Sequence, residues 1–284
     1  MFGFLKKKEA GNGYGLRLGD YVNPQDSVLQ IASKEVVSCR EDDRIIDVLA
    51  SMLAGVRRMP VLGETGEIKG IVSSTDVLDF IGAGEKGKLF TNTGLSAIVK
   101  KIMSPCSQYL SATDSIPVAL EFFKAHGMPI QPIASQKNLH AVISESDMVN
   151  IISRPTGMRV SHVMSQKPFM ITEDYAIFDV AKMLCRGPYR RLPVVSKGVA
   201  TGIVTPHDIL SYLNRNESLN SIRLELSPIK SIMSKEVSHV SPEADVHEAV
   251  KIMKLKKVSG LPVVNEDMDM LGMLTKKDII RIMH

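Results

Sequence analysis

Aromatic residues and cysteines are scarce in this chain. Its 284 residues include no tryptophan, 5% aromatic residues and three cysteines, Cys39, Cys106 and Cys185. The cysteines stand singly, so neighbouring thiols form neither a CxxC metal site nor a disulfide framework, and we expect free thiols in a reducing compartment. The few aromatic residues do not interleave with basic ones, which weighs against a surface that stacks on nucleic-acid bases.

Long apolar runs are also missing. None approaches the roughly 20 residues that a membrane-spanning helix requires. The N-terminal stretch, MFGFLKKKEAGNGYG, has its apolar residues ahead of its lysines and lacks the apolar core of a secretory signal. We therefore expect a cytoplasmic protein in which residues 1–24 form a flexible tail. A weak membrane-surface anchor at residues 2–8 is the alternative interpretation of this stretch.

Sequence signatures of catalysis and of metal binding are absent as well. The seven histidines form no HExxH pattern, no GxSxG elbow occurs, and no acidic cluster has the spacing for two metal ions. Gly82–Lys88 matches the GxxxxGK pattern of a phosphate-binding loop, but Leu89 stands where that loop needs Ser or Thr to hold magnesium. We interpret residues 82–94 as a mobile loop that closes over a neighbouring site. We expect no catalytic residue, no metal ion and no enzymatic activity.

The composition is that of a soluble globular protein. Hydrophobic residues make up 44% of the chain and charged residues 23%, and the length allows a substantial core to be buried. The net charge is +4 and the pI is about 8.8. Such a mild positive charge tolerates anionic small ligands without by itself indicating nucleic acid.

A degenerate repeat occurs four times along the chain. Its clearest copy is RRLPVVSKGVATGIVTPHD at Arg190–Asp208, and the others lie at Arg57–Asp76, Pro129–Asp147 and Ser259–Asp278. In every copy a proline in an apolar stretch precedes an aspartate by 15 or 16 residues, and in three copies a Met-Ser pair stands 29 residues ahead of the proline. This regularity predicts a repeat architecture.

Each copy predicts the same order of elements: strand, helix, strand, strand, helix. In the first unit, apolar spacing predicts a helix at 44–53, strands at 59–62 and 68–73, and a short helix at 76–81. Later first helices are expected at 116–125, 176–185 and 246–255, and the second helices are expected to open at Asp147, Asp208 and Asp278. A unit of this size would be marginal alone, so we expect the units to pair back to back into two modules. We place the units at residues 25–90, 95–155, 158–216 and 226–284.

A hydroxyl residue stands three positions ahead of the closing aspartate in every unit. The pairs are Ser73 and Asp76, Ser144 and Asp147, Thr205 and Asp208, and Thr275 and Asp278. This pattern is typical of a capping box at a helix start. The same turn would also suit a ligand, because free backbone N–H groups can face an anion and the carboxylate can accept hydrogen bonds from the hydroxyls of a ribose. Both interpretations can hold together.

Arginine pairs precede the central proline in units one and three only. They are Arg57-Arg58 and Arg190-Arg191. One such pair would be ordinary solvated surface, but its recurrence in alternate units favours a phosphate clamp, because guanidinium groups bind phosphate oxygens bidentately. His207 would add a further donor, or would be an exposed histidine at a helix start.

Glycine supports the same hypothesis. Gly70, Gly202 and Gly272 lie in the strand that leads to the hydroxyl, where they would let a ligand approach the backbone closely. Unit two has Ala141 at this position and no arginine pair. Its site is therefore expected to be the emptiest.

The repeated LPVV…GIVTxxD pattern, with IMS upstream, resembles the CBS (cystathionine β-synthase) domain over nearly all of residues 22–284. Two such domains form a Bateman module. Four in one chain, with RRMP and RRLP in units one and three only, resemble the γ regulatory subunit of AMP-activated protein kinase and its prokaryotic relatives. The resemblance implies an α/β (α+β) fold of four βαββα units, paired as two Bateman modules in a disc, with adenosyl ligands in the clefts between paired units.

The resemblance also implies roles for individual residues. Asp76 and Asp208 would hold ribose, Ser73 and Thr205 would hold phosphate or ribose, and Arg57, Arg58, Arg190 and Arg191 would meet the phosphates. Adenine would rest near Ile71 and Ile203, with the chain near Leu110 and Val240 as the opposite wall. Weaker sites are implied at Ser144 and Asp147 and at Thr275 and Asp278, where no basic residue precedes the proline and only Lys276 and Lys277 could partly substitute.

Together these features predict a non-enzymatic sensor of adenine nucleotides. AMP, ADP or ATP would be the ligands, no other cofactor is required, and the signal would pass to an unidentified protein partner; a homodimer is compatible with this. Two alternatives stay open. A nucleic-acid-binding protein would fit the pI and the arginine pairs, and its binding would depend steeply on salt. A binder of S-adenosylmethionine or methylthioadenosine would leave the arginines without a phosphate.

Overall fold

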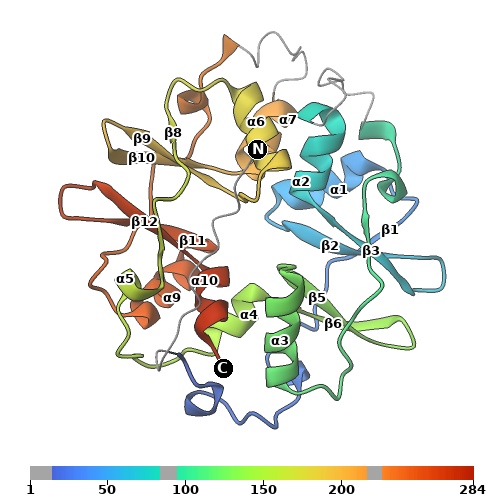
Figure 1. Cartoon of the computed structure of the whole chain (residues 1–284). Coiled ribbons are helices and arrows are strands. Elements are labelled where there is room, and N and C mark those ends of the chain that lie inside the picture. Colours follow the sequence, from blue (N-terminus) through green and yellow to red (C-terminus); the bar gives the residue numbers. More distant parts are fainter. Residues whose placement is uncertain (1–14, 84–94, 216–225) are drawn as a thin grey trace, which may run out of the picture.

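Four β-hairpins form the framework of the molecule (Figure 1). The computed structural model describes residues 15–83, 95–215 and 226–284. The hairpins pair β2 (Arg58–Leu62) with β3 (Ile68–Ser73), β5 (Ile130–Ser135) with β6 (Asn138–Ser144), β9 (Leu192–Ser196) with β10 (Val199–Val204), and β11 (Gly260–Val264) with β12 (Met270–Thr275). Each hairpin is the centre of one repeat unit.

A first strand of the same unit lies parallel beside each hairpin. β1 (Cys39–Arg40) pairs with β2, and β8 (Ile171–Thr172) pairs with β9. In units two and four a single bridge replaces this strand, from Leu110 to Ile133 and from Val240 to Val263. The predicted βαββα order and α/β fold class are thus confirmed, with first strands shorter than a full β-strand.

Two helices accompany each hairpin. The first helices are α1 (Ile45–Leu53), α3 (Ile116–His126), α6 (Ile177–Arg186) and α9 (Val246–Leu255), and the second are α2 (Ser74–Leu78), α4 (Glu145–Asn150), α7 (Pro206–Arg215) and α10 (Lys276–Ile282). The second helices begin two residues ahead of the predicted aspartates. The reason is that the hydroxyl residue is the N-cap and the aspartate is the third helical residue, as a capping box requires.

The chain ahead of each unit crosses to the hairpin of a partner unit. β4 (Ser104–Pro105), which leads into unit two, pairs with β3 of unit one, and Ser33 of unit one bridges to Val142 of unit two. In the same way β7 (Ser165–Gln166) pairs with β12, and Ser234 bridges to Ile203. This reciprocal exchange holds units one and two together as one module, and units three and four as the other.

Helices join the two modules. One buried cluster combines apolar residues of units one and three, and a second combines those of units two and four. α2 contacts α6 and α7 across the first junction, and α10 contacts α3 and α4 across the second. The four units therefore surround a common centre (Figure 1), where the second helices begin.

The repeated Met-Ser pair accounts for the glycines of the hairpins. A Cβ at Gly202 would lie 2.5 Å from the Sδ of Met233, and one at Gly272 would lie 2.6 Å from the Sδ of Met164. A Cβ at Gly70 would meet the carbonyl oxygen of Ser104 at 2.6 Å. The glycines thus admit a methionine and a serine from the partner unit, and this correction replaces the expected close approach of a ligand.

The predicted flexible tail is wrong for residues 15–24. The backbone of Leu16 donates to the carbonyl of Ile282 at 2.8 Å and accepts from His284 at 2.9 Å. Leu16 and Leu18 are buried in the cluster of units two and four, because this pairing brings them against the C-terminal helix. Residues 1–14, with the anchor interpretation, and residues 84–94 of the expected mobile loop lie outside the described residues. No helix among those described is long and apolar enough to span a bilayer.

Candidate functional site

The helix-start aspartates use the same carboxylate oxygen for the helix cap in every unit. In all four units Oδ2 accepts from the hydroxyl at 2.6 Å and from the backbone N–H of the same residue at 2.7 to 3.0 Å. The Oδ1 of Asp208 accepts from Ser234 at 3.3 Å, and that of Asp278 accepts from Ser165 at 3.2 Å. The capping role therefore uses Oδ2 and leaves Oδ1 outside the cap. In Asp208 and Asp278, Oδ1 already accepts one serine hydroxyl.

One cleft surrounds Asp76, and we call it the unit-one cleft. Its volume is about 310 Å³. Unit one supplies Arg58, Ile71, Ser73, Thr75 and Asp76, the chain entering unit two supplies Ser104, and unit three supplies Tyr189 and Arg190. Of the residues predicted for the site of this unit, Arg58, Ile71, Ser73 and Asp76 are thus brought together, and Arg57 is not among them. Arg190, which the sequence assigned to unit three, lines this cleft.

A second cleft surrounds Asp208, and we call it the unit-three cleft. Its volume is about 760 Å³. Unit three supplies Arg191, Ile203, Thr205, His207 and Asp208, unit four supplies Ser234 and Glu236 to His239, and unit one supplies Arg57. Each arginine pair is therefore split: one member faces the cleft of its own unit, and the other faces the cleft of the opposite module.

The wall opposite the adenine residues differs from the expectation. Leu110 and Val240 are buried in the cluster of units two and four. Their upstream neighbours line the clefts, namely Ser104 in the unit-one cleft, and Ser234 and Glu236 to His239 in the unit-three cleft. The reason is that the crossing segment pairs with the partner unit, and the chain then returns to its own hairpin at Leu110 and Val240.

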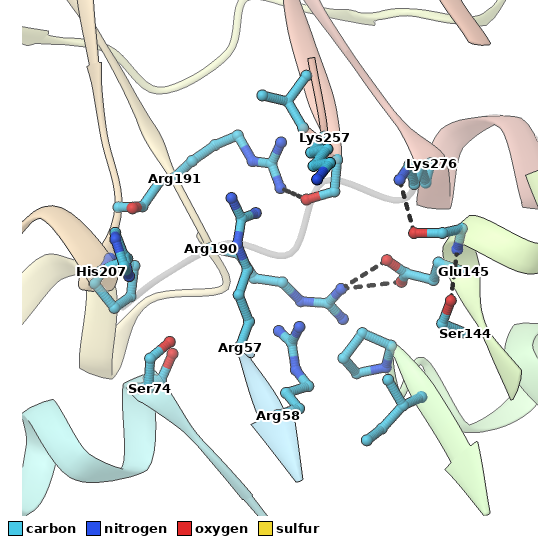
Figure 2. A pocket seen from close by; sticks show the side chains of 18 of the residues that line it. Arg57, Arg58, Ser74, Ser144, Glu145, Arg190, Arg191, His207, Lys257 and Lys276 are labelled. Atoms are coloured by element: carbon cyan, nitrogen blue, oxygen red, sulfur yellow. Dashed lines mark hydrogen bonds and ion pairs between the residues drawn. The ribbon is translucent and has the colours of Figure 1, made fainter. Parts of the chain in front are cut away.

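A central cavity of about 290 Å³ (Figure 2) shares lining residues with both clefts. Its lining includes all four predicted arginines together with Ser144, His207, Lys257, Lys276 and Glu145. Of the weaker predicted sites, that of unit four has a buried aspartate: Asp278 is 6% exposed and lies 3.6 Å from Arg281, and Lys276 donates to Ser146 at 2.8 Å. Asp147 and Thr275 take part in capping boxes.

Glu145 and Lys257 are residues that sequence reasoning missed. Glu145 is 7% exposed, and its two carboxylate oxygens lie 2.9 and 3.1 Å from Nη1 of Arg190. The signal for Glu145 was available, because it follows the hydroxyl of unit two directly and the residues at that position in all four units line the cavity. No repeat feature marked Lys257.

Burial and mutual repulsion lower the pKa values of several cations that line the central cavity. Burial, reinforced by Arg190 and Arg57, lowers the pKa of Arg58 to about 10. Burial, reinforced by Arg57, likewise lowers the pKa of Arg191 to about 10, and burial lowers the pKa of Lys276. Burial raises the pKa of Asp76, although Ser73 and Arg58 oppose the change. Buried positive charge of this kind favours a bound anion.

Nucleophilic or metal chemistry finds little support in the described part of the chain. Cys185 lines the unit-one cleft, and burial raises the pKa of its thiol to about 12, so the reactive thiolate is scarce at neutral pH. No group of three or more His, Cys, Asp or Glu residues in the described ranges is placed to hold a metal ion.

Known proteins share this architecture. The model of the CBS domain matches residues 28–83, 160–215 and 229–284, more than half of the chain. It passes over unit two, whose hairpin and helices nevertheless have the same order as the other three.

The most informative relatives are archaeal. The chain is 27% identical to protein MJ1225 of Methanocaldococcus jannaschii over 273 residues, which cover 89% of this chain and 98% of that one. The crystal structure of MJ1225, described as a proposed archaeal homologue of γ-AMPK, has a TM-score of 0.83 at 25% identity and covers 90% of this chain and 99% of its own. A 33.4 kDa protein of Thermofilum pendens is 26% identical over 84% of each chain.

Four relatives are named homoserine O-acetyltransferase. The homoserine O-acetyltransferase of Methanococcoides burtonii is 30% identical over 162 residues, which cover 56% of this chain and 31% of that enzyme. The shared part is thus a minority of the enzyme. The repeats, the exchanged segments and the family match agree, and the chain belongs to the CBS domain family.

Proposed function

We propose that this chain is a non-enzymatic, cytoplasmic sensor that binds adenine nucleotides in the unit-one and unit-three clefts. The observation that carries the proposal is the composition of the two clefts: each combines a helix-start aspartate with one arginine from unit one and one from unit three. Both volumes lie in the range of small-molecule sites. The similarity to MJ1225, the proposed archaeal homologue of γ-AMPK, supports the same ligand class.

Within each cleft the parts of a nucleotide would find distinct partners. The Oδ1 of Asp76 or Asp208, which the helix cap does not use, would accept a hydrogen bond from ribose, while Ile71 or Ile203 would contact the adenine. The guanidinium groups would bind phosphate from two directions. Partly buried cations with lowered pKa values gain most from such a ligand, because a phosphate compensates the charge for the hydration that burial removed.

The number of phosphates on the bound nucleotide would determine the state that the sensor adopts. AMP, ADP and ATP place different charge at the central cavity, so each would stabilise a different arrangement of the arginines. Because those arginines belong to both modules, a change at the centre would alter how the modules sit and which surface a protein partner, or a second copy in a homodimer, meets. The sites of units two and four would bind weakly or not at all.

Calorimetric titration with AMP tests the proposal. Wild-type protein is expected to bind at two sites, and Asp208→Ala is expected to lose about 10- to 100-fold in affinity at one of them, because charge-assisted hydrogen bonds to ribose are removed. Asp174→Ala, at a side chain that is 88% exposed, is the matched control. Unchanged AMP binding by Asp208→Ala would remove the ribose role.

The same titrations separate the other ligand classes. S-adenosylmethionine or methylthioadenosine would bind Arg190→Ala as well as wild type, because neither ligand carries a phosphate. A nucleic-acid-binding protein would instead bind an oligonucleotide without nucleotide, and its affinity would fall steeply between 50 and 200 mM salt.

A further inference from the structure

In all four units, the residue that follows the capping hydroxyl lines the central cavity. It is occupied by Ser74, Glu145, Pro206 and Lys276, and all four residues line the cavity. Units one and three, which carry the better clefts, have uncharged residues there. Units two and four have opposite charges there, at helices α4 and α10, which contact each other.

Glu145 is the acidic member of this lining. Of the described residues around the cavity, six are arginine or lysine and one, Glu145, is acidic. Both of its carboxylate oxygens accept hydrogen bonds from Nη1 of Arg190. The Nη2 of Arg190 donates to the carbonyl of Gly127 at 2.8 Å. Arg190 is thereby held against unit two, as Figure 2 shows.

The same arginine faces the unit-one cleft. A phosphate in that cleft and the carboxylate of Glu145 are therefore alternative partners for one guanidinium group. The carboxylate also acts on the other cations, because its charge raises the pKa values of Arg58, Arg191 and Lys276 against the lowering caused by burial.

We infer that Glu145 is an internal anion that competes with ligand phosphate for Arg190 and so limits the affinity of the cavity for polyphosphates. The inference rests on the proposed nucleotide function and deepens it. A ligand with one phosphate makes few contacts with the cations of the central cavity. A triphosphate would extend into that cavity and be repelled by the carboxylate of Glu145. Glu145 thus shifts the preference of the unit-one cleft toward the monophosphate, and unit two contributes to specificity although its own site is weak.

The test is Glu145→Gln, which keeps the size of the side chain and removes its charge. Affinity for ATP is expected to rise about tenfold, because Arg190 is freed and one repulsive charge is lost, and affinity for AMP is expected to rise less. Glu243→Gln is the matched control, since Glu243 pairs with Arg159 at side chains that are 64% and 61% exposed. An unchanged or reduced ATP affinity in folded Glu145→Gln would overturn the inference.

A second variant decides the matter if Glu145→Gln does not fold. Ser74→Glu places a second carboxylate at the equivalent position of unit one and is expected to lower ATP affinity more than AMP affinity. Equal affinities for wild type and Ser74→Glu would then count against competition by a carboxylate at this position.

Pyrophosphate separates this inference from the proposed function. If no variant binds AMP or ATP but Glu145→Gln binds pyrophosphate about tenfold more tightly than wild type, the competing anion is real and the nucleotide proposal is wrong. If nucleotides bind wild type and Asp208→Ala weakens them, while Glu145→Gln changes neither nucleotide nor pyrophosphate affinity, the function stands and the role of Glu145 falls.

Discussion

Asp76 serves the fold and the candidate site with different atoms of one carboxylate. Its Oδ2 caps α2 through the hydroxyl and backbone N–H of Ser73, at 2.6 and 2.7 Å. Its Oδ1 is left for the cleft, and burial raises the pKa of the group. A carboxylate kept in a buried position at some cost to stability is characteristic of a functional residue.

Asp76→Asn is predicted to change how the stability of the protein depends on pH. A raised folded pKa means that the stability contributed by the group is present at low pH and is lost as pH rises through that pKa. Asparagine does not titrate, so the variant lacks this loss. The free energy of unfolding of Asp76→Asn minus that of wild type should therefore increase from about pH 4 to pH 7. Urea unfolding at several pH values measures the difference. A difference that does not vary with pH would contradict the account, and AMP affinity of the unit-one cleft should fall in either case.

At the level of elements, the exchanged segment and the hairpin fit by size. Met233 lies over Gly202, Met164 over Gly272 and Met103 over Gly70. At the hairpin of unit two, Ala141 stands in place of Gly, and Ala32-Ser33 of unit one stands in place of Met-Ser. Ser33 bridges to Val142 as Ser234 bridges to Ile203. The hairpin residue is thus one methyl group larger than glycine, and the facing residue is shorter than methionine, as avoidance of a steric clash requires.

Gly202→Ala is therefore predicted to destabilise the protein by about 1–3 kcal/mol, because its Cβ would overlap Met233. Met233→Ala removes a buried side chain and is expected to cost about 2 kcal/mol or more. The double variant should cost less than the sum, by roughly 0.5 kcal/mol or more, since each change accommodates the other.

Urea unfolding of the four proteins in this cycle gives the coupling. Gly202→Ala combined with Met103→Ala is the control, because Met103 lies over the glycine of the other module and the two effects should add. Additive effects of Gly202→Ala and Met233→Ala would show that size matching does not govern this contact.

Local patterns in the sequence were sufficient for the elements and for the helix-start aspartates. The period of the proline and the aspartate gave the hairpins, and the hydroxyl three residues earlier gave the caps. The destination of the Met-Ser pair was not predictable in this way, because a crossing segment finds its partner through contacts with another unit. The burial of Leu16 and Leu18 was missed for the same reason, since their partners lie at the far end of the chain.

At the scale of the whole molecule, docking of the two modules creates the centre. Buried clusters combine units one and three on one side and units two and four on the other. That docking directs Arg190 to the unit-one cleft and Arg57 to the unit-three cleft. Recurrence of the arginine pairs predicted a basic site. Which cleft each arginine reaches depends on how the modules dock, and no local pattern encodes that docking. Glu145 was missed because the units were compared at their hydroxyl, aspartate, glycine and arginine positions, and not at the residue that follows the hydroxyl.

The measurement that tests the central claim most directly is AMP titration in the Asp208→Ala background, where the unit-one cleft is the better remaining site. If arginines serve the opposite module, adding Arg190→Ala should lower the remaining AMP affinity at least about tenfold, whereas adding Arg191→Ala should leave it within about twofold. If Arg190→Ala leaves that affinity unchanged, or Arg191→Ala is the damaging change, the shared clefts described here are not the nucleotide sites.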